Sequence, residues 1–330
     1  MAEHSAISWC DATFNPWIGC TKVSPACKHC YAERWAARFG HVFTPTRTSA
    51  ANWRKPLAWN AKAERTGRGL RVFCASLGDV FDNAAPDAWR ADLWPLIEAT
   101  PSLTWVLLTK RIGNAGRMLP PPWLERPLPN VWFGATVVNQ EEADRDIPKL
   151  LAVPAAVHFV SCEPLLGPIG FDHEWLESES FGHADDCNDE FCTLNADEHS
   201  CAGQVFRQPS IDWVIVGGES GADARPIHPE WVRSIRDQCA LAHVPFHFKQ
   251  WGEWAPNCLC DTKAAHATTK RPEPGKMGVM FRCGTRRAGR ELDGKVWAEF
   301  PGMTGAPSGA RGTAGAERCD APAHPADGAR

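Results

Sequence analysis

Three cysteines near the amino terminus have a spacing that suits metal chemistry. Cys20, Cys27 and Cys30 form the pattern C-x6-C-x2-C within "CTKVSPACKHC". A disulfide uses two thiols, and a closed structural zinc site uses four protein ligands. A cubane iron–sulfur cluster held by three thiolates keeps its fourth iron open to a small ligand, so these cysteines predict a 4Fe–4S site. The alternative is zinc, with Cys10 or His29 as the fourth ligand.

Polar residues also recur directly after short apolar runs. Six such runs occupy residues 70–82, 103–111, 130–140, 157–168, 212–221 and 244–252, and "ATFNPWIGC" forms an irregular run before them. Near-continuous apolar strands separated by helix-compatible stretches are typical of a parallel sheet covered on both faces. About seven such units predict an α/β fold, a partial or full barrel of the TIM type, with an open doubly wound sheet as the alternative.

The expected strand ends bring polar side chains to one mouth, because the carboxyl ends of all barrel strands meet at the active-site face. The candidate site residues at these ends are Ser76, Asp79, Asp82, Lys110, Glu163, Gly217, Gly218, Glu219, Arg225 and Lys249. Gly217 and Gly218 allow close backbone approach, without the G-x-G-x-x-G pattern of a dinucleotide site. Asp79 and Asp82 have the alternative role of capping the following helix, and Lys110 and Arg111 that of solvated loop charges.

A series of longer motifs supports a family resemblance. The segments "TFNPWIGCTKVSPACKHCYAE", "GDVFD", "LLTKR", "SCEPLLGP", "VIVGGESG", "FKQWG" and "AGRELDG" follow one another between residues 7 and 300. Together they resemble the radical S-adenosylmethionine superfamily, whose usual spacing is C-x3-C-x2-C. They resemble most closely an uncharacterised phage- and bacteria-associated family with the extended C-x6-C-x2-C spacing.

The resemblance implies cofactors, partners and residue roles. It implies a 4Fe–4S cluster on the three cysteines, S-adenosylmethionine bound at the open iron, and a flavodoxin- or ferredoxin-like reductant. Ser76, Asp79 and Asp82 are then expected to approach the methionine ammonium group. Lys110 and Arg111 are expected to pair with the cofactor carboxylate or a substrate phosphate, and Glu163 to meet the ribose hydroxyls or the substrate.

The expected activity is generation of a 5′-deoxyadenosyl radical that abstracts hydrogen from a substrate, which we expect to be a nucleobase or nucleic acid that is modified or repaired. The basic residues near the carboxyl terminus are the hint toward nucleic acid; Arg282, Arg286, Arg287 and Arg290 form either a phosphate-binding patch or a solvated face. The alternative function is a non-catalytic zinc-binding module that binds nucleic acid or a protein partner.

Three segments depart from the strand series of the barrel region at 1–254. Residues 173–208 form an acidic insertion between the fifth and sixth strands. Its Cys187, Cys192, His199 and Cys201 either bind zinc or lie in a flexible loop. Residues 255–301 form a basic extension with a hairpin whose arms are "MFRCG" and "RELDGKVW", and the Gly-, Ala- and Pro-rich residues 302–330 are expected to be a disordered tail.

The composition limits the expected binding partners and the expected cellular location of the protein. The formal net charge of −4 argues against coating of nucleic acid through bulk positive charge. The 14 cysteines occur without a secretory signal, which favours metal binding over a disulfide framework. No apolar run is long enough to cross a bilayer, so we expect a cytoplasmic protein without a membrane partner.

A helix is expected directly after the third cysteine. Tyr31, Trp35 and Phe39 recur at i, i+4 and i+8, and Gly40 follows as a stop signal. This spacing predicts that the three rings form the buried stripe of the helix.

Overall fold

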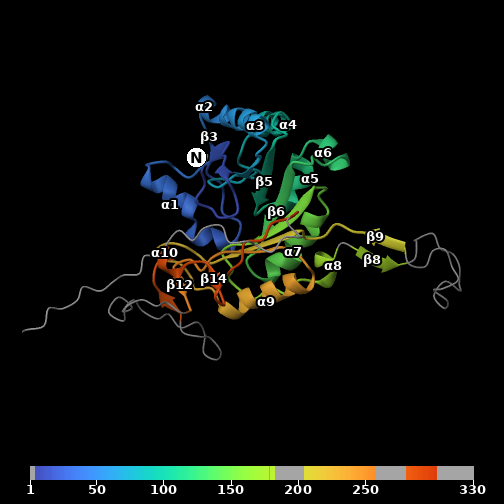
Figure 1. The fold of residues 1–330 in the computed structure, drawn as a ribbon. Helices are drawn as coiled ribbons and strands as arrows, with labels where there is room; N and C mark the ends of the chain where they lie inside the picture. Colours follow the sequence, from blue (N-terminus) through green and yellow to red (C-terminus); the bar gives the residue numbers. More distant parts are fainter. Residues whose placement is uncertain (1–3, 178, 183–203, 257–279, 303–330) are drawn as a thin grey trace, which may run out of the picture.

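The computed structural model describes residues 4–177, 179–182, 204–256 and 280–302. Its centre is a parallel sheet of seven strands that curls into a half-barrel (Figure 1). The strands are β1 (Ala12–Thr13), β4 (Leu70–Cys74), β5 (Leu103–Thr109), β6 (Val131–Thr136), β7 (Val157–Cys162), β10 (Trp213–Gly217) and β11 (Phe246–Gln250). They lie side by side in chain order, whereas a doubly wound sheet reverses its order at a switch point. The six expected strands and the irregular first one are therefore confirmed, and the fold is a partial barrel in which β1 and β11 are the two edges.

Helices follow one another around the convex face of the sheet (Figure 1). They are α3 (Lys55–Thr66), α4 (Asp87–Glu98), α5 (Ala115–Met118), α6 (Pro121–Glu125), α7 (Gln140–Leu151) and α9 (Pro229–Leu241). The other helical elements are η1 (Pro25–His29), α1 (Tyr31–Arg38), α2 (Ala50–Trp53), η2 (Ile112–Asn114), α8 (His173–Leu176) and α10 (Thr285–Ala288). The polar residue after β6, Asn139, accepts a hydrogen bond from the Glu142 backbone and so caps α7.

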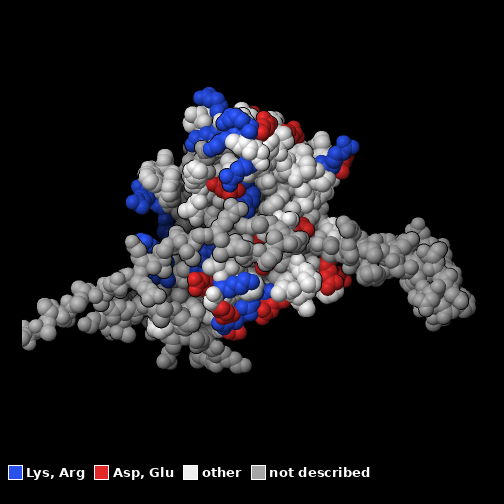
Figure 2. Space-filling view, in the orientation of Figure 1, with Lys and Arg blue, Asp and Glu red and all other residues white. Residues whose placement is uncertain are grey.

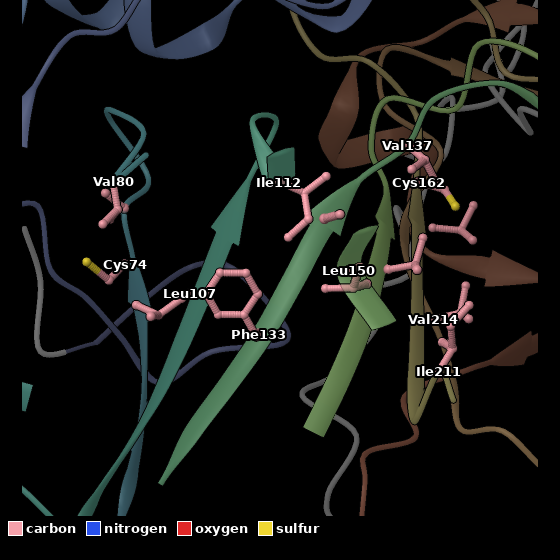
Figure 3. Close-up of a cluster of buried hydrophobic side chains, with 14 of the residues drawn as sticks. Cys74, Val80, Leu107, Ile112, Phe133, Val137, Leu150, Cys162, Ile211 and Val214 are labelled. Atoms are coloured by element: carbon pink, nitrogen blue, oxygen red, sulfur yellow. The ribbon is translucent and has the colours of Figure 1, made fainter. Parts of the chain in front are cut away.

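The main core lies between the helices and the convex face of the sheet. Figure 3 shows Leu107 of β5, Phe133 of β6 and Val214 of β10 pointing to this side, beside Leu150 of α7. All four side chains are fully buried. Each strand thus presents alternate residues to the helices, and the residues between them face the concave side.

Aromatic rings fill the concave side of the half-barrel. Trp9 lies 4.6 Å from Phe73 of β4 and 6.4 Å from Trp213 of β10, although three strands separate β4 from β10 in the sheet. One ring reaches both strands only because the sheet curls. Gly134 of β6 leaves space for Phe159, since a Cβ atom at residue 134 would lie 2.3 Å from the Phe159 ring.

Four short antiparallel strand pairs lie outside the seven-stranded sheet. They are β2 (Trp17–Ile18) with β3 (Thr46–Arg47), β8 (Glu179–Gly182) with β9 (Gln204–Arg207), β12 (Trp254–Ala255) with β13 (Phe281–Arg282), and β14 (Glu291–Leu292) with β15 (Lys295–Val296). The β8–β9 pair projects from the barrel between β7 and β10, where the insertion is expected (Figure 1). The predicted hairpin is wrong in its pairing, because "MFRCG" pairs with β12 and "RELDGKVW" folds back on itself as β14 and β15.

Two expectations concern residues outside the described part of the chain. The candidate zinc ligands Cys187, Cys192, His199 and Cys201 lie in the undescribed stretch 183–203, and the expected tail lies almost wholly in 303–330. Within the described ranges, every helix is too short or too polar to span a bilayer.

Candidate active site

A cavity of about 410 Å³ opens at the carboxyl ends of the barrel strands. The predicted site residues that line it are Cys20, Cys27, Cys30, Ser76, Asp79, Lys110, Glu163, Gly218, Glu219 and Lys249. Asp82, Gly217 and Arg225 do not line the cavity but lie next to residues that do, which are Arg111, Glu163 and Glu219 respectively. The strand ends therefore converge as a parallel barrel requires.

The three-cysteine loop forms one wall of this cavity. Cys20 follows β2, Cys27 lies in η1, and Cys30 is the N-cap residue of α1. All three are free thiols. Ser24 caps η1 by accepting a hydrogen bond from the Ala26 backbone N–H, so the loop has a defined local structure.

Thiols are the donors that both zinc sites and iron–sulfur clusters use, so the donor set of this loop fits either group. Among the described residues, no three His, Cys, Asp or Glu side chains are placed to hold one metal ion. Burial and the charge of Asp79 raise the pKa of the Cys20 thiol to about 12, so metal binding there must displace a proton.

A buried ion cluster anchors the loop next to Cys20. Arg111 lies 3.0 Å from Asp79 and 3.3 Å from Asp82 across its guanidinium group. The Thr21 backbone N–H donates to Asp82 at 2.6 Å, and Arg111 donates to the Thr21 hydroxyl at 2.6 Å. Asp82 is only 1% exposed, so its carboxylate is used within the protein and does not face the cavity.

This arrangement changes the expected roles of the two aspartates. Asp82 does not reach the cavity, where an ammonium group would lie, and Asp79 lines the cavity with its carboxylate already paired to Arg111. The alternative of helix capping is wrong for both, because α4 begins at Asp87 without a side-chain cap. Arg111 is likewise a buried partner and not a solvated loop charge.

A second ion pair anchors the loop next to Cys27 and Cys30. Glu219, which follows β10, accepts from Arg225 at 2.7 Å, and its other oxygen lies 3.2 Å from His29 Nδ1. Arg225 also donates to the backbone carbonyl of Pro25, at the start of η1. Burial acts to raise the pKa of Glu219, but the hydrogen bonds from Arg225 outweigh it and hold this pKa below its ordinary value. The loop is thus fixed to β10 at one end and to β4 and β5 at the other.

Three further charged side chains, Glu163, Lys249 and Lys110, line the same cavity. Lys249 of β11 lies 3.0 Å from Glu163, which also accepts from Ser161 at 3.2 Å. Gly217 leaves room for this carboxylate, since a Cβ atom at residue 217 would lie 2.5 Å from Glu163 Oε1. Lys110 donates to Thr136 at 3.3 Å and has no carboxylate partner among the described residues.

Some site residues were not predicted from the sequence. Thr21, Ser161 and Arg34 line or anchor the cavity. Ser161 lies two residues before Glu163 and therefore shares its face of β7, a signal that strand periodicity provides. Arg34 has no comparable signal, because its contact with the Ser220 carbonyl depends on the tertiary placement of α1.

The four basic residues near the carboxyl terminus do not form one patch. Arg286 and Arg287 are exposed on α10, whereas Arg282 donates to the carbonyls of Gly221 and Ala222. Arg290 is half-buried, and burial lowers its pKa. The predicted phosphate site is therefore divided between the surface and the interior.

The predicted stripe of α1 is wrong. Its buried residues are Ala32 and Ala36, whereas Tyr31 is 51% exposed and Phe39 is 58% exposed. Trp35 is half-buried, and the Tyr31 side chain borders the cavity, where its hydroxyl donates to the Ser76 carbonyl.

Comparisons with known proteins bear on the family. Neither the curated proteins nor the solved structures include a match to this chain. A family model described as a protein of unknown function, DUF5131, matches residues 4–301, which span nearly the whole described fold. The chain therefore belongs to the DUF5131 family.

Proposed function

We propose that this protein is a radical S-adenosylmethionine enzyme whose Cys20, Cys27 and Cys30 hold a 4Fe–4S cluster. One observation carries the proposal: three free thiols from a single loop line one cavity at the carboxyl ends of a half-barrel. A three-thiolate site leaves one iron open to a ligand in the cavity. When bound, the cluster supplies the electron that cleaves the sulfonium of S-adenosylmethionine.

The chain's own residues position the reactants. Lys110 offers an ammonium group without a carboxylate partner among the described residues, which suits the carboxylate of the methionine moiety. Glu163 and Lys249 present a paired acceptor and donor in the same cavity, where they can orient ribose hydroxyls or a substrate. The ion pairs of Arg111 and Arg225 hold the loop in place before any cofactor binds.

Anaerobic reconstitution with iron and sulfide tests the proposal. We expect about four irons per chain, a brown colour that bleaches with dithionite, and conversion of S-adenosylmethionine to 5′-deoxyadenosine. Cys20→Ala should lose both the iron and the conversion. Cys283→Ser should keep both, because Cys283 is a half-buried free thiol that does not line the cavity.

Two results would contradict the proposal. One is a colourless protein that takes up stoichiometric zinc and no iron, which would support a zinc-binding module. The other is undiminished 5′-deoxyadenosine formation by Cys20→Ala.

A further inference from the structure

The outward side of α1 carries an exposed row of aromatic rings. Tyr31 and Phe39 are 51% and 58% exposed; the half-buried Trp35 lies between them in the sequence, and Phe39 follows the last residue of the helix. The ring centroids of Trp35 and Phe39 lie 4.8 Å apart, and the His41 ring lies parallel to Trp35 at 6.0 Å with an interplanar angle of 9°. Apolar rings are usually buried, so a row of them on the surface marks an interaction site.

Cations flank these rings. Arg34 and Arg38 lie on α1 between the aromatic positions, and Figure 2 shows Lys and Arg side chains over α1 on the left of the view. Arg34 and Arg282 both donate to the backbone of residues 220–222, so the positive charge continues from α1 toward α10. Of the nearby carboxylates, Glu33 is paired with Lys22 at 2.7 Å and Asp223 is exposed. We call the set Tyr31, Arg34, Trp35, Arg38, Phe39, His41 and Arg282 the aromatic–basic face.

The aromatic–basic face runs directly into the cavity. Tyr31 and Arg34 belong to both, because each also lines the cavity wall. The Tyr31 hydroxyl donates to the Ser76 carbonyl at the end of β4. A chain lying on α1 would therefore reach the mouth of the cavity at the Tyr31 end.

We propose that the aromatic–basic face binds single-stranded nucleic acid and delivers one base to the cavity. Unpaired bases stack on exposed rings, and arginines between the rings neutralise the phosphates. In a duplex the bases are already stacked on each other and cannot cover the rings. The inference deepens the proposed function, since it names the substrate class of the same cavity.

Binding is measured by fluorescence anisotropy with a labelled single strand of about 15 nucleotides, as DNA and as RNA. The full chain is used as purified, without reductant or S-adenosylmethionine. We expect binding that weakens with salt, and a duplex of the same sequence should bind more weakly. The DNA and RNA strands show which backbone is preferred.

Two variants separate stacking from charge. Phe39→Ala should raise the Kd by about tenfold and leave the salt slope unchanged, whereas Phe39→Tyr should restore binding. Arg38→Gln should lower the slope of log K against log salt by about 0.7. The matched controls are Leu241→Ala on α9 and Arg126→Gln after α6, both exposed and outside the aromatic–basic face, and neither should change binding.

Three outcomes overturn the inference: equal affinity for the duplex, equal losses in the control variants, or displacement of the strand by polyglutamate of equal charge. The last would mark the face as a docking site for an acidic protein. Because the assay needs no cluster, its failure is distinguishable from failure of the proposed radical chemistry, which the iron content and 5′-deoxyadenosine report.

Discussion

Arg111 illustrates how single residues support the cysteine loop. Its guanidinium group neutralises Asp79 and Asp82, and all three side chains are at most 7% exposed. A buried charge that loses its partner is costly, while an exposed pair contributes little. We therefore expect Arg111 to contribute strongly to the free energy of unfolding, because its ion pairs are buried.

Replacement of Arg111 by Met should lower the free energy of unfolding by about 3–5 kcal/mol, because two buried carboxylates lose their cation. Lys22→Met is the matched control, since the Lys22–Glu33 pair is exposed and belongs to the same loop region, and it should leave the free energy of unfolding nearly unchanged. Urea unfolding measures both. Equal losses in the two variants would show that burial of the pair is unimportant.

Glu219 should make stability depend on pH. Its pKa is lower in the folded protein than in the unfolded chain, so the carboxylate stabilises the fold at pH values above the ordinary glutamate pKa of about 4.3. This contribution is lost as the pH falls toward the lower folded pKa. Thermal melting from neutral pH to about pH 3.5 should therefore show a steeper loss for the wild type than for Glu219→Gln. Parallel curves would contradict the role of the pair.

For single residues, the sequence predicts which side chains lie at the cavity better than it predicts their ion-pair partners. Asp79 and Glu219 could be assigned to the cavity wall, because strand ends in a parallel barrel converge. Their ion-pair partners depend on the path of the loop, which no local pattern specifies. The ring positions on α1 show the same limit, since the i, i+4 spacing of Tyr31 and Trp35 is identical for a buried and an exposed stripe.

At the level of elements, the ends of β10 and β11 come unusually close. A Cβ atom at Gly218 would lie 1.9 Å from the Trp251 carbonyl oxygen, whereas one at Gly217 would meet the Glu163 side chain. Backbone cannot move aside as a side chain can. Gly218 is therefore needed for the close approach of the two strand ends, whereas Gly217 leaves space for the Glu163 side chain in the cavity.

Gly218→Ala should lower the free energy of unfolding by about 3 kcal/mol or more, because β10 and β11 must separate. Gly217→Ala should cost less than about 1 kcal/mol while shifting Glu163 within the cavity. Chemical denaturation compares the two, and the reconstituted Gly217→Ala protein should show altered turnover. A mild Gly218→Ala effect would mean that the strands tolerate a wider approach.

Strand existence was predictable here, whereas the pairing of the short strands was not. The apolar runs that correspond to β4, β5, β6, β7, β10 and β11 are long enough for periodicity to identify them. The pairing of β13 with β12 joins residues more than 20 positions apart, and two-residue strands carry too little pattern to select a partner.

At the scale of the whole molecule, the carboxyl-terminal segment completes the half-barrel. Phe248 of β11 donates to the Trp297 carbonyl, and Glu299 donates back to the Phe246 carbonyl, so this segment covers the β11 edge. Covering an exposed edge removes a site for unwanted strand pairing. The segment then continues under the barrel, where Phe300 packs 5.2 Å from Trp213 and Arg71 of β4 lies 3.9 Å above its ring.

Phe300 therefore links strands from both halves of the sheet, and its removal should loosen the barrel as a unit. Phe300→Ala should lower the free energy of unfolding by about 2–3 kcal/mol, less than for a fully buried ring because Phe300 is half-buried. Phe39→Ala makes the same chemical change at an exposed site and should alter stability by less than about 0.5 kcal/mol. Urea denaturation of the two variants beside the wild type measures the difference. If both substitutions lower the free energy of unfolding by the same amount, Phe300 does not stabilise the barrel. The contacts of the carboxyl-terminal segment with β4 and β10 would then be unimportant for stability.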